Sequence, residues 1–205
     1  MSQSAPPFNR PLRTITNKNE RGLAGIKNPM TTKYVAFLRA INVGGNRVVK
    51  MDSLRGMFES LGFTNVGTYI QSGNVIFESP EADASTLEKR IESHLAQSLG
   101  FEVESFLRTM SEVAAIVENC PFEEKEGETV FIPLLHVPPG RQTREALLAL
   151  TTGTDSFAVQ GREAYWLRRD RDKSPFSNNL IEKTLGMSVT TRNLNTMKKI
   201  LEKYR

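Results

Sequence analysis

Alternating stretches of apolar and polar residues predict that strands and helices follow one another along most of this chain. Residues 33–39 alternate and are rich in β-branched and aromatic side chains, which is typical of a strand. Residues 52–61 place four apolar side chains on one helical stripe, and Gly62 then ends the predicted helix. Two short strands at 68–71 and 74–78 flank a Ser-Gly turn, which predicts a hairpin.

The pattern continues through a second helix and a further strand. Ser85 and Glu88 have the spacing of a capping box, and the helix that they open carries leucine or isoleucine at steps of four residues before Gly100. Residues 101–108 follow as a half-exposed strand. The order in residues 32–110 is therefore strand, helix, strand, strand, helix, strand, as in a ferredoxin-like unit.

A weaker version of this order recurs in the second half. After a predicted helix and an acidic linker at 111–129, strands and helices alternate again and end in a helix at 194–204. Pro133 lies inside the first of these strands, which predicts an edge strand or a bulge. We predict an α+β protein with duplicated ferredoxin-like βαββα units, antiparallel sheets and helices on one face, the first unit at 32–110 and the second at 130–205 with its C-terminal helix. Chance similarity between two amphipathic halves is the competing explanation.

The first 31 residues differ from the rest. Residues 1–31 are rich in Ser, Pro, Asn, Thr and Arg and show no apolar period, so we predict a disordered N-terminal extension. Five basic residues against one acidic residue approach the composition of an organellar transit peptide. Because Pro6, Pro7 and Pro11 work against the amphipathic helix of such a peptide, a plain tail is the favoured interpretation.

Composition excludes several classes of protein. Hydrophobic residues make up 39% and charged residues 24% of the chain, as in a soluble globular protein. No apolar run approaches the roughly 20 residues that a membrane helix requires. The single cysteine, Cys120, excludes an internal disulfide and fits a reducing compartment, so we expect a cytoplasmic protein.

The net charge of +4 does not describe a uniformly basic protein. Residues 1–29 account for all of it, whereas residues 30–161 carry −6 and residues 162–205 carry +6. Residues 162–205 contain Tyr165 and Trp166, and ferredoxin-like sheets can stack RNA bases on such aromatic rings. Alternation along a strand, however, places these two rings on opposite faces of the sheet. Nucleic-acid binding by this part is therefore an alternative function only. The basic residues of the stretch are Arg162, Arg168, Arg169, Arg171 and Lys173.

The predicted topology gathers polar residues at one end of the first sheet. A right-handed crossover makes the first two strands parallel and the third antiparallel. The loop after the first strand and the turn between the next two strands then lie at the same end of the sheet. Packing does not require a guanidinium, amides and glycines to gather there, so the cluster favours a functional role. These residues are Arg39, Asn42, Gly44, Gly45, Gln71, Ser72, Gly73 and Asn74.

Two of the polar segments have structural explanations as well as functional ones. Gly44 and Gly45 lie between a strand and a helix, where backbone N–H groups can hold a phosphate, but a tight turn explains the glycines alone. The segment before the last helix contains Asn193 and Asn195, which suit helix capping. Arg192 is unfavourable at a helix N-terminus, and either an anionic ligand or an ion pair accounts for it.

Three segments resemble a known family. FLRAINVGGN, LGFTNVGTYIQSGNVIF and SNNLIEKTLGM followed by VTTRNLNTMKK are similar to the bacterial domain-of-unknown-function family numbered 1697, over residues 32–205. Ala40 stands where glycine is usual, which implies a less permissive backbone. Leu194 stands where tryptophan is usual and removes an aromatic surface. The resemblance implies an α+β fold with a duplicated ferredoxin-like unit and no established activity.

These observations favour a binding protein. Its pocket for a small anionic or nucleotide-like ligand would be formed by the Gly-Gly loop, the QSGN turn and the TTRN helix start, and Arg39→Ala and Arg192→Ala are expected to lose ligand binding while remaining folded. An enzyme acting on a phosphorylated small molecule is the main alternative, although no nucleophile motif is present. No residues have metal-ligand spacing, so we expect no metal site. The sequence indicates neither a cofactor nor an oligomeric state.

Overall fold

The computed structural model describes Met1, residues 31–43 and residues 47–205. The predicted N-terminal extension, except for Met1 and Thr31, and the two glycines of the Gly-Gly loop lie outside the described residues.

The first repeat forms a four-stranded antiparallel sheet with two crossover helices. Its strands lie in the order β2-β3-β1-β4, which is the arrangement expected of a ferredoxin-like unit. The elements are β1 (Thr32–Leu38), α1 (Met51–Ser60), β2 (Thr64–Tyr69), β3 (Asn74–Ser79), α2 (Ala84–Leu99) and β4 (Ser105–Thr109).

The second repeat has the same topology, with strand order β6-β7-β5-β8. One further helix follows each repeat: α3 (Met110–Glu118) after the first and α6 (Leu194–Tyr204) after the second. The structure therefore confirms the predicted duplicated α+β fold. The elements of the second repeat are β5 (Thr129–Leu134), α4 (Arg141–Leu148), β6 (Asp155–Gln160), β7 (Glu163–Arg168), α5 (Asn178–Leu185) and β8 (Thr190–Asn193).

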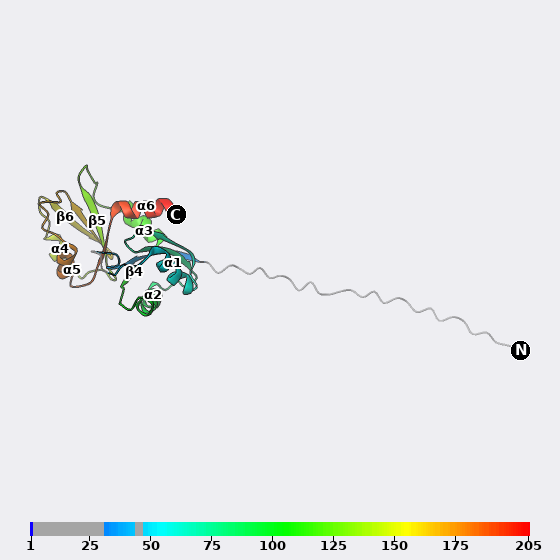
Figure 1. Cartoon of the computed structure of the whole chain (residues 1–205). Helices are drawn as coiled ribbons and strands as arrows, with labels where there is room; N and C mark the ends of the chain where they lie inside the picture. The colour runs from blue at the N-terminus through cyan, green and yellow to red at the C-terminus, as the bar shows by residue number, and fades with distance from the viewer. Residues whose placement is uncertain (2–30, 44–46) are drawn as a thin grey trace. The chain divides into compact units, whose positions relative to one another are not determined.

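Three hydrophobic cores hold these layers together. The crossover helices of each repeat cover one face of its sheet, which we call the outer face, and the opposite inner faces share a central core with α3 and α6. Successive residues of β1 show the alternation: Tyr34 packs in the outer core, and Val35 packs in the central one. Figure 1 shows α3 and α6 side by side, away from α4 and α5.

Three local predictions were wrong. Helix α2 begins two residues earlier than expected, because Asp83 rather than Ser85 is the N-cap: its carboxylate accepts from the Thr86 amide at 3.0 Å. Glu88 does not complete a capping box, since its carboxylate accepts from the Leu107 amide at 2.8 Å on the open edge of β4. Pro133 lies in β5, an interior strand, where the pairing with β7 is interrupted.

The strand β8 was not predicted at all. The four residues Thr190–Asn193 pair with β5, whereas the sequence suggested only the start of a helix. A strand of four polar residues has no apolar alternation, and its Arg192 is buried. The helix that follows was predicted correctly, and Asn193 caps it by accepting from the Thr196 amide at 2.8 Å.

Two buried arginines join the repeats reciprocally. Arg108 of β4 donates through Nε to Glu163 at 2.7 Å, and Arg192 of β8 donates through Nε to Asn74 at 2.6 Å. Glu163 and Asn74 are the first residues of β7 and β3, so each arginine reaches the same position in the other repeat. This exchange is what internal duplication with pseudo-twofold packing would produce.

Candidate functional site

The structure brings together the polar loops at one end of the first sheet. The Asn42 side chain donates to the Gln71 carbonyl at 2.9 Å and to the Val49 carbonyl at 3.0 Å, and it accepts from the Val49 amide at 2.7 Å. Asn42 therefore ties the loop after β1 to the β2–β3 turn. In that turn Gly73 has φ 71°, and a Cβ there would lie 2.7 Å from the Ile41 side chain, so only glycine fits.

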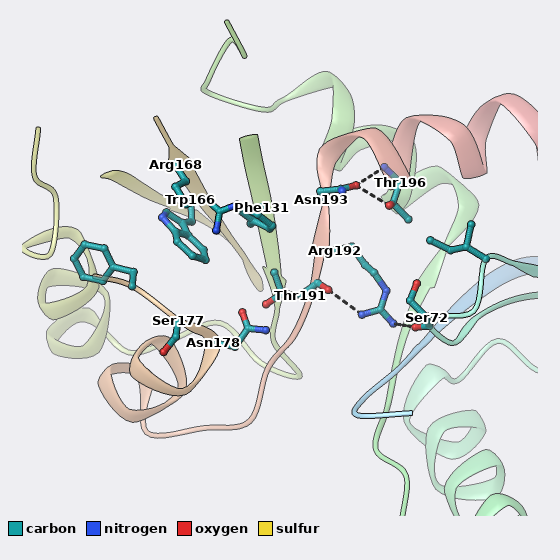
Figure 2. Close-up of a pocket in the computed structure, with 12 residues that line it drawn as sticks. Ser72, Phe131, Trp166, Arg168, Ser177, Asn178, Thr191, Arg192, Asn193 and Thr196 are labelled. Atoms are coloured by element: carbon teal, nitrogen blue, oxygen red, sulfur yellow. Dashed lines mark hydrogen bonds between the residues drawn. The ribbon is translucent and has the colours of Figure 1, made fainter. Parts of the chain in front are cut away.

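Arg192 is held entirely by the protein. Its Nη1 donates to Thr190 Oγ1 and to the Thr191 carbonyl, both at 2.9 Å, while Nη2 donates to the carbonyls of Leu38 at 2.9 Å and Ser72 at 2.8 Å. With the Nε bond to Asn74, all five N–H groups have acceptors. Burial lowers the pKa of Arg192 to about 10. This guanidinium holds the β2–β3 turn against β8 and has no donor left for a ligand (Figure 2).

The remaining predicted residues have separate roles. Arg39 forms a two-pronged ion pair with Glu182 of α5, both bonds at 3.1 Å, and a further bond to Glu104 at 2.9 Å. It therefore links the end of β1 to both repeats. Asn193 is occupied in capping α6, and Asn195 lies exposed on that helix.

A pocket of about 560 Å³ lies beside this junction, on the outer face of the second sheet. Figure 2 shows that β5, β7, β8 and the start of α5 supply most of its side chains and that Ser72 approaches from the first repeat. We call it the Arg168 pocket. It is lined by Ile70, Ser72, Phe131, Trp166, Arg168, Phe176, Ser177, Asn178, Thr191, Arg192, Asn193 and Thr196.

Arg168 gives this pocket its chemical character. Its guanidinium carbon lies 4.6 Å from the centre of the Phe131 ring and 5.7 Å from that of Trp166. Trp166 is fixed in turn, because its Nε1 donates to the buried Asp155 carboxylate at 2.6 Å. Within the described residues no carboxylate forms an ion pair with Arg168, and the lining contains two arginines and no acidic residue.

Sequence reasoning found only part of this pocket. Ser72, Arg192 and Asn193 belonged to the predicted site, whereas the residues of β5 and β7 did not. Arg168 and Trp166 had been placed in the basic, aromatic stretch, and this was the available signal. The prediction that Tyr165 and Trp166 face opposite ways was correct: Tyr165 lies in the central core.

A smaller cavity of about 250 Å³ adjoins the Arg168 pocket. The two share Asn178, Thr191 and Arg192 as lining residues, so these three form the partition between them. Arg39, Ala40 and other residues line the far side of the smaller cavity.

Ala40 explains one departure from the family pattern. Its φ is 57°, in the left-handed region that glycine adopts most easily. Ala40→Gly is therefore expected to raise the free energy of unfolding by up to about 1 kcal/mol, since relief of strain exceeds the added flexibility of the unfolded chain. Ala96→Gly, inside α2, should instead lower it by about 1 kcal/mol. Urea unfolding of both variants checks the sign, and a loss at Ala40 would contradict the prediction.

The other departure has a structural explanation. Leu194 is 3% exposed and packs in the central core, so this position is a packing site and offers no surface for stacking.

In 31–43 and 47–205, no group of three His, Cys, Asp or Glu side chains is placed to hold a metal ion. None of the helices in that part of the chain has the length and apolar character needed to cross a bilayer.

Comparison with known proteins identifies a protein of the same fold and the family of this chain. The solved structure of a conserved bacterial protein, SP0830 from Streptococcus pneumoniae, aligns with a TM-score of 0.66 at 23% identity, covering 84% of this chain and 98% of that chain. This similarity shows a shared fold. No curated protein matches the chain. Residues 30–165, which include the first two of the three sequence segments, match the family described as "Protein of unknown function (DUF1697)", and the chain therefore belongs to the DUF1697 family, as the resemblance had suggested.

Proposed function

We propose that this protein binds a small anionic or nucleotide-like ligand in the Arg168 pocket. The observation that carries the proposal is the lining itself: it holds no carboxylate, and Arg168 is positioned by two aromatic rings rather than by an ion pair. When the flat face of a guanidinium lies against aromatic rings, the N–H groups around its edge remain available. Such groups can donate to a phosphate or a carboxylate.

The start of α5 supports an anion at the same place. The Ser177 hydroxyl accepts from the Leu180 amide at 3.4 Å, which leaves its own hydrogen free to donate. The first amides of a helix have no partner within the helix, so those of Asn178 and Asn179 are also available. Together with Arg168, these groups would surround a ligand with hydrogen-bond donors.

The residues predicted from sequence take supporting roles in this proposal. Ser72 and Asn193 would line the ligand site, whereas Arg192 and Asn74 would hold the β2–β3 turn in place. Arg39 would fix the position of α5 through Glu182. The proposed site thus moves from the end of the first sheet to the junction of the two repeats.

The lining favours binding over acid–base chemistry. Among the described residues that line the Arg168 pocket there is no Asp, Glu, His or Cys, and these are the side chains that most often serve as bases or nucleophiles. RNA binding is also less favoured, because Arg162 and Arg169 are paired with Glu112 and Glu128. The salt dependence expected of phosphate-backbone contacts would be correspondingly weak.

Arg168→Gln tests the proposal. We expect inorganic phosphate and adenosine 5′-monophosphate to stabilise the parent protein, by about 2.7 kcal/mol at 100 times the dissociation constant. The variant should bind at least about tenfold more weakly, because it loses the charge but keeps similar length. Thermal unfolding with and without each compound measures both quantities.

Arg141→Gln is the matched control. Its side chain is 92% exposed and pairs with Glu145 of its own helix, so its removal should leave binding unchanged. Equal binding by the parent and Arg168→Gln, or no stabilisation of the parent by either compound, would show that the proposed site is wrong.

A further inference from the structure

The two repeats cover their outer faces unequally. Helix α2 has 16 residues and α5 has eight. Both end at a glycine in the left-handed conformation, Gly100 and Gly186, a few residues before β4 and β8. The C-terminal ends of the two helices therefore correspond, and α5 lacks about the first two turns of α2.

Strand register identifies the residues that those turns cover. Val35 and Ile132 pair with the two reciprocal arginines, so Tyr34 corresponds to Phe131. Tyr34 pairs with Phe77, and Phe131 pairs with Trp166. By the same register Ser79 corresponds to Arg168, and Leu107, just before Arg108, corresponds to Thr191.

In the first repeat this part of the sheet is closed. Leu107 and Tyr34 are buried in one core with Leu87 and Ile91, which belong to the first two turns of α2. The Tyr34 hydroxyl also donates to the Glu81 carbonyl at 3.0 Å, just before that helix. Tyr34 and Leu107 are therefore inaccessible to a ligand.

In the second repeat the same positions line the Arg168 pocket. The pocket thus lies on the part of the sheet that the missing turns would have covered. Two of the replacements change the character of the position: Arg168 stands where the first repeat has the buried Ser79, and the smaller Thr191 stands where it has the core residue Leu107.

We propose, on the basis of the proposed function, that Thr191 sets the size of the ligand that the Arg168 pocket accepts. Thr191 forms part of the partition between this pocket and the smaller cavity. Its Oγ1 is buried and has no hydrogen-bond partner among the described residues, so its hydroxyl is shielded from a ligand. The volume of the side chain, rather than the hydroxyl, is then the property that acts on the ligand.

Three substitutions at Thr191 separate volume from hydrogen bonding. Thr191→Val keeps the volume and removes the hydroxyl, Thr191→Leu restores the residue found at this position in the first repeat, and Thr191→Ala opens the partition. Titration of each variant with inorganic phosphate and adenosine 5′-monophosphate, followed by thermal unfolding or calorimetry, gives the affinities.

We expect Thr191→Leu to weaken binding of the nucleotide at least about tenfold, since one added methylene in a close-fitting pocket has an effect of that order. Phosphate binding should change less than about twofold, because Arg168 is retained. Thr191→Val should bind both compounds like the parent, and Thr191→Ala should bind the nucleotide at least as tightly as the parent.

Other results overturn the inference. If Thr191→Val loses as much affinity as Thr191→Leu, the hydroxyl acts on the ligand. If Thr191→Leu loses phosphate affinity and nucleotide affinity equally, the substitution distorts the site as a whole. Weakened nucleotide binding by Thr191→Ala would show that the volume of this side chain does not limit the ligand, and this test holds even if Thr191→Leu folds poorly. If the parent binds neither compound, the proposed function fails and this inference fails with it, whereas normal parent binding with an unaffected Leu variant overturns the inference alone.

Discussion

Arg192→Ala is expected to lower the free energy of unfolding by at least about 3 kcal/mol. The substitution leaves the carbonyls of Leu38 and Ser72 and the side-chain oxygen of Asn74 without their donor. Each buried acceptor that loses its partner costs about 1–3 kcal/mol. Urea unfolding at pH 7 measures the loss. The sequence-based expectation was that this variant would lose ligand binding while remaining folded, and the buried contacts of Arg192 add this loss of stability to it.

Two variants make this result specific. Arg141→Ala removes an exposed ion pair and should change stability by less than about 1 kcal/mol. Arg192→Lys keeps the charge but has three donors rather than five, so its free energy of unfolding should lie between those of Arg192→Ala and the parent. A loss below about 1 kcal/mol for Arg192→Ala would mean that the two repeats do not depend on this arginine.

Arg108→Ala is expected to have an effect of similar size, about 3–5 kcal/mol, because it breaks a buried ion pair and leaves Glu163 uncompensated. The Arg108 side chain is fully buried, and it also donates to the carbonyls of Leu107 and Leu135, both at 2.8 Å. Burial lowers the pKa of Arg108, which is the direction expected for a cation removed from water. Urea unfolding again gives the loss.

Glu163→Gln is the matched variant for this pair. The glutamine oxygen can still accept from Arg108 Nε, and the backbone carbonyls remain as acceptors, so the loss should be smaller than that of Arg108→Ala. If the glutamine variant is the less stable of the two, the charge of Glu163 rather than the arginine network holds this junction.

Several features were predictable because they depend on local pattern. The last helix at 194–204 was predicted with its observed bounds, since Leu194, Met197, Ile200 and Leu201 repeat at helical spacing. The meeting of Asn42 with Gln71 followed from the handedness of a single crossover. Ser177 caps α5, the role that a serine just before a helix favours.

Other features were missed because they depend on contacts between distant residues. Arg192 was interpreted as a ligand-binding residue, but its partners Asn74 and Leu38 lie 118 and 154 residues away in sequence. No local pattern indicates that a polar residue will be buried when its acceptors come from the other repeat. The strand β8 was missed for the same reason, since its polar residues are ordered by pairing with β5.

The sequence by itself determined the secondary structure apart from β8, the duplication and the end of the sheet where polar loops meet, because hydrophobic period and crossover handedness are local properties. Only the tertiary structure decided which polar groups are satisfied inside the protein and which remain available. Arg192 and Arg168 are both arginines of the second repeat, yet one has acceptors for all five of its N–H groups and the other lies against two rings beside an open pocket. That difference arises from how the two repeats pack around each arginine, which the hydrophobic period of the neighbouring residues does not indicate.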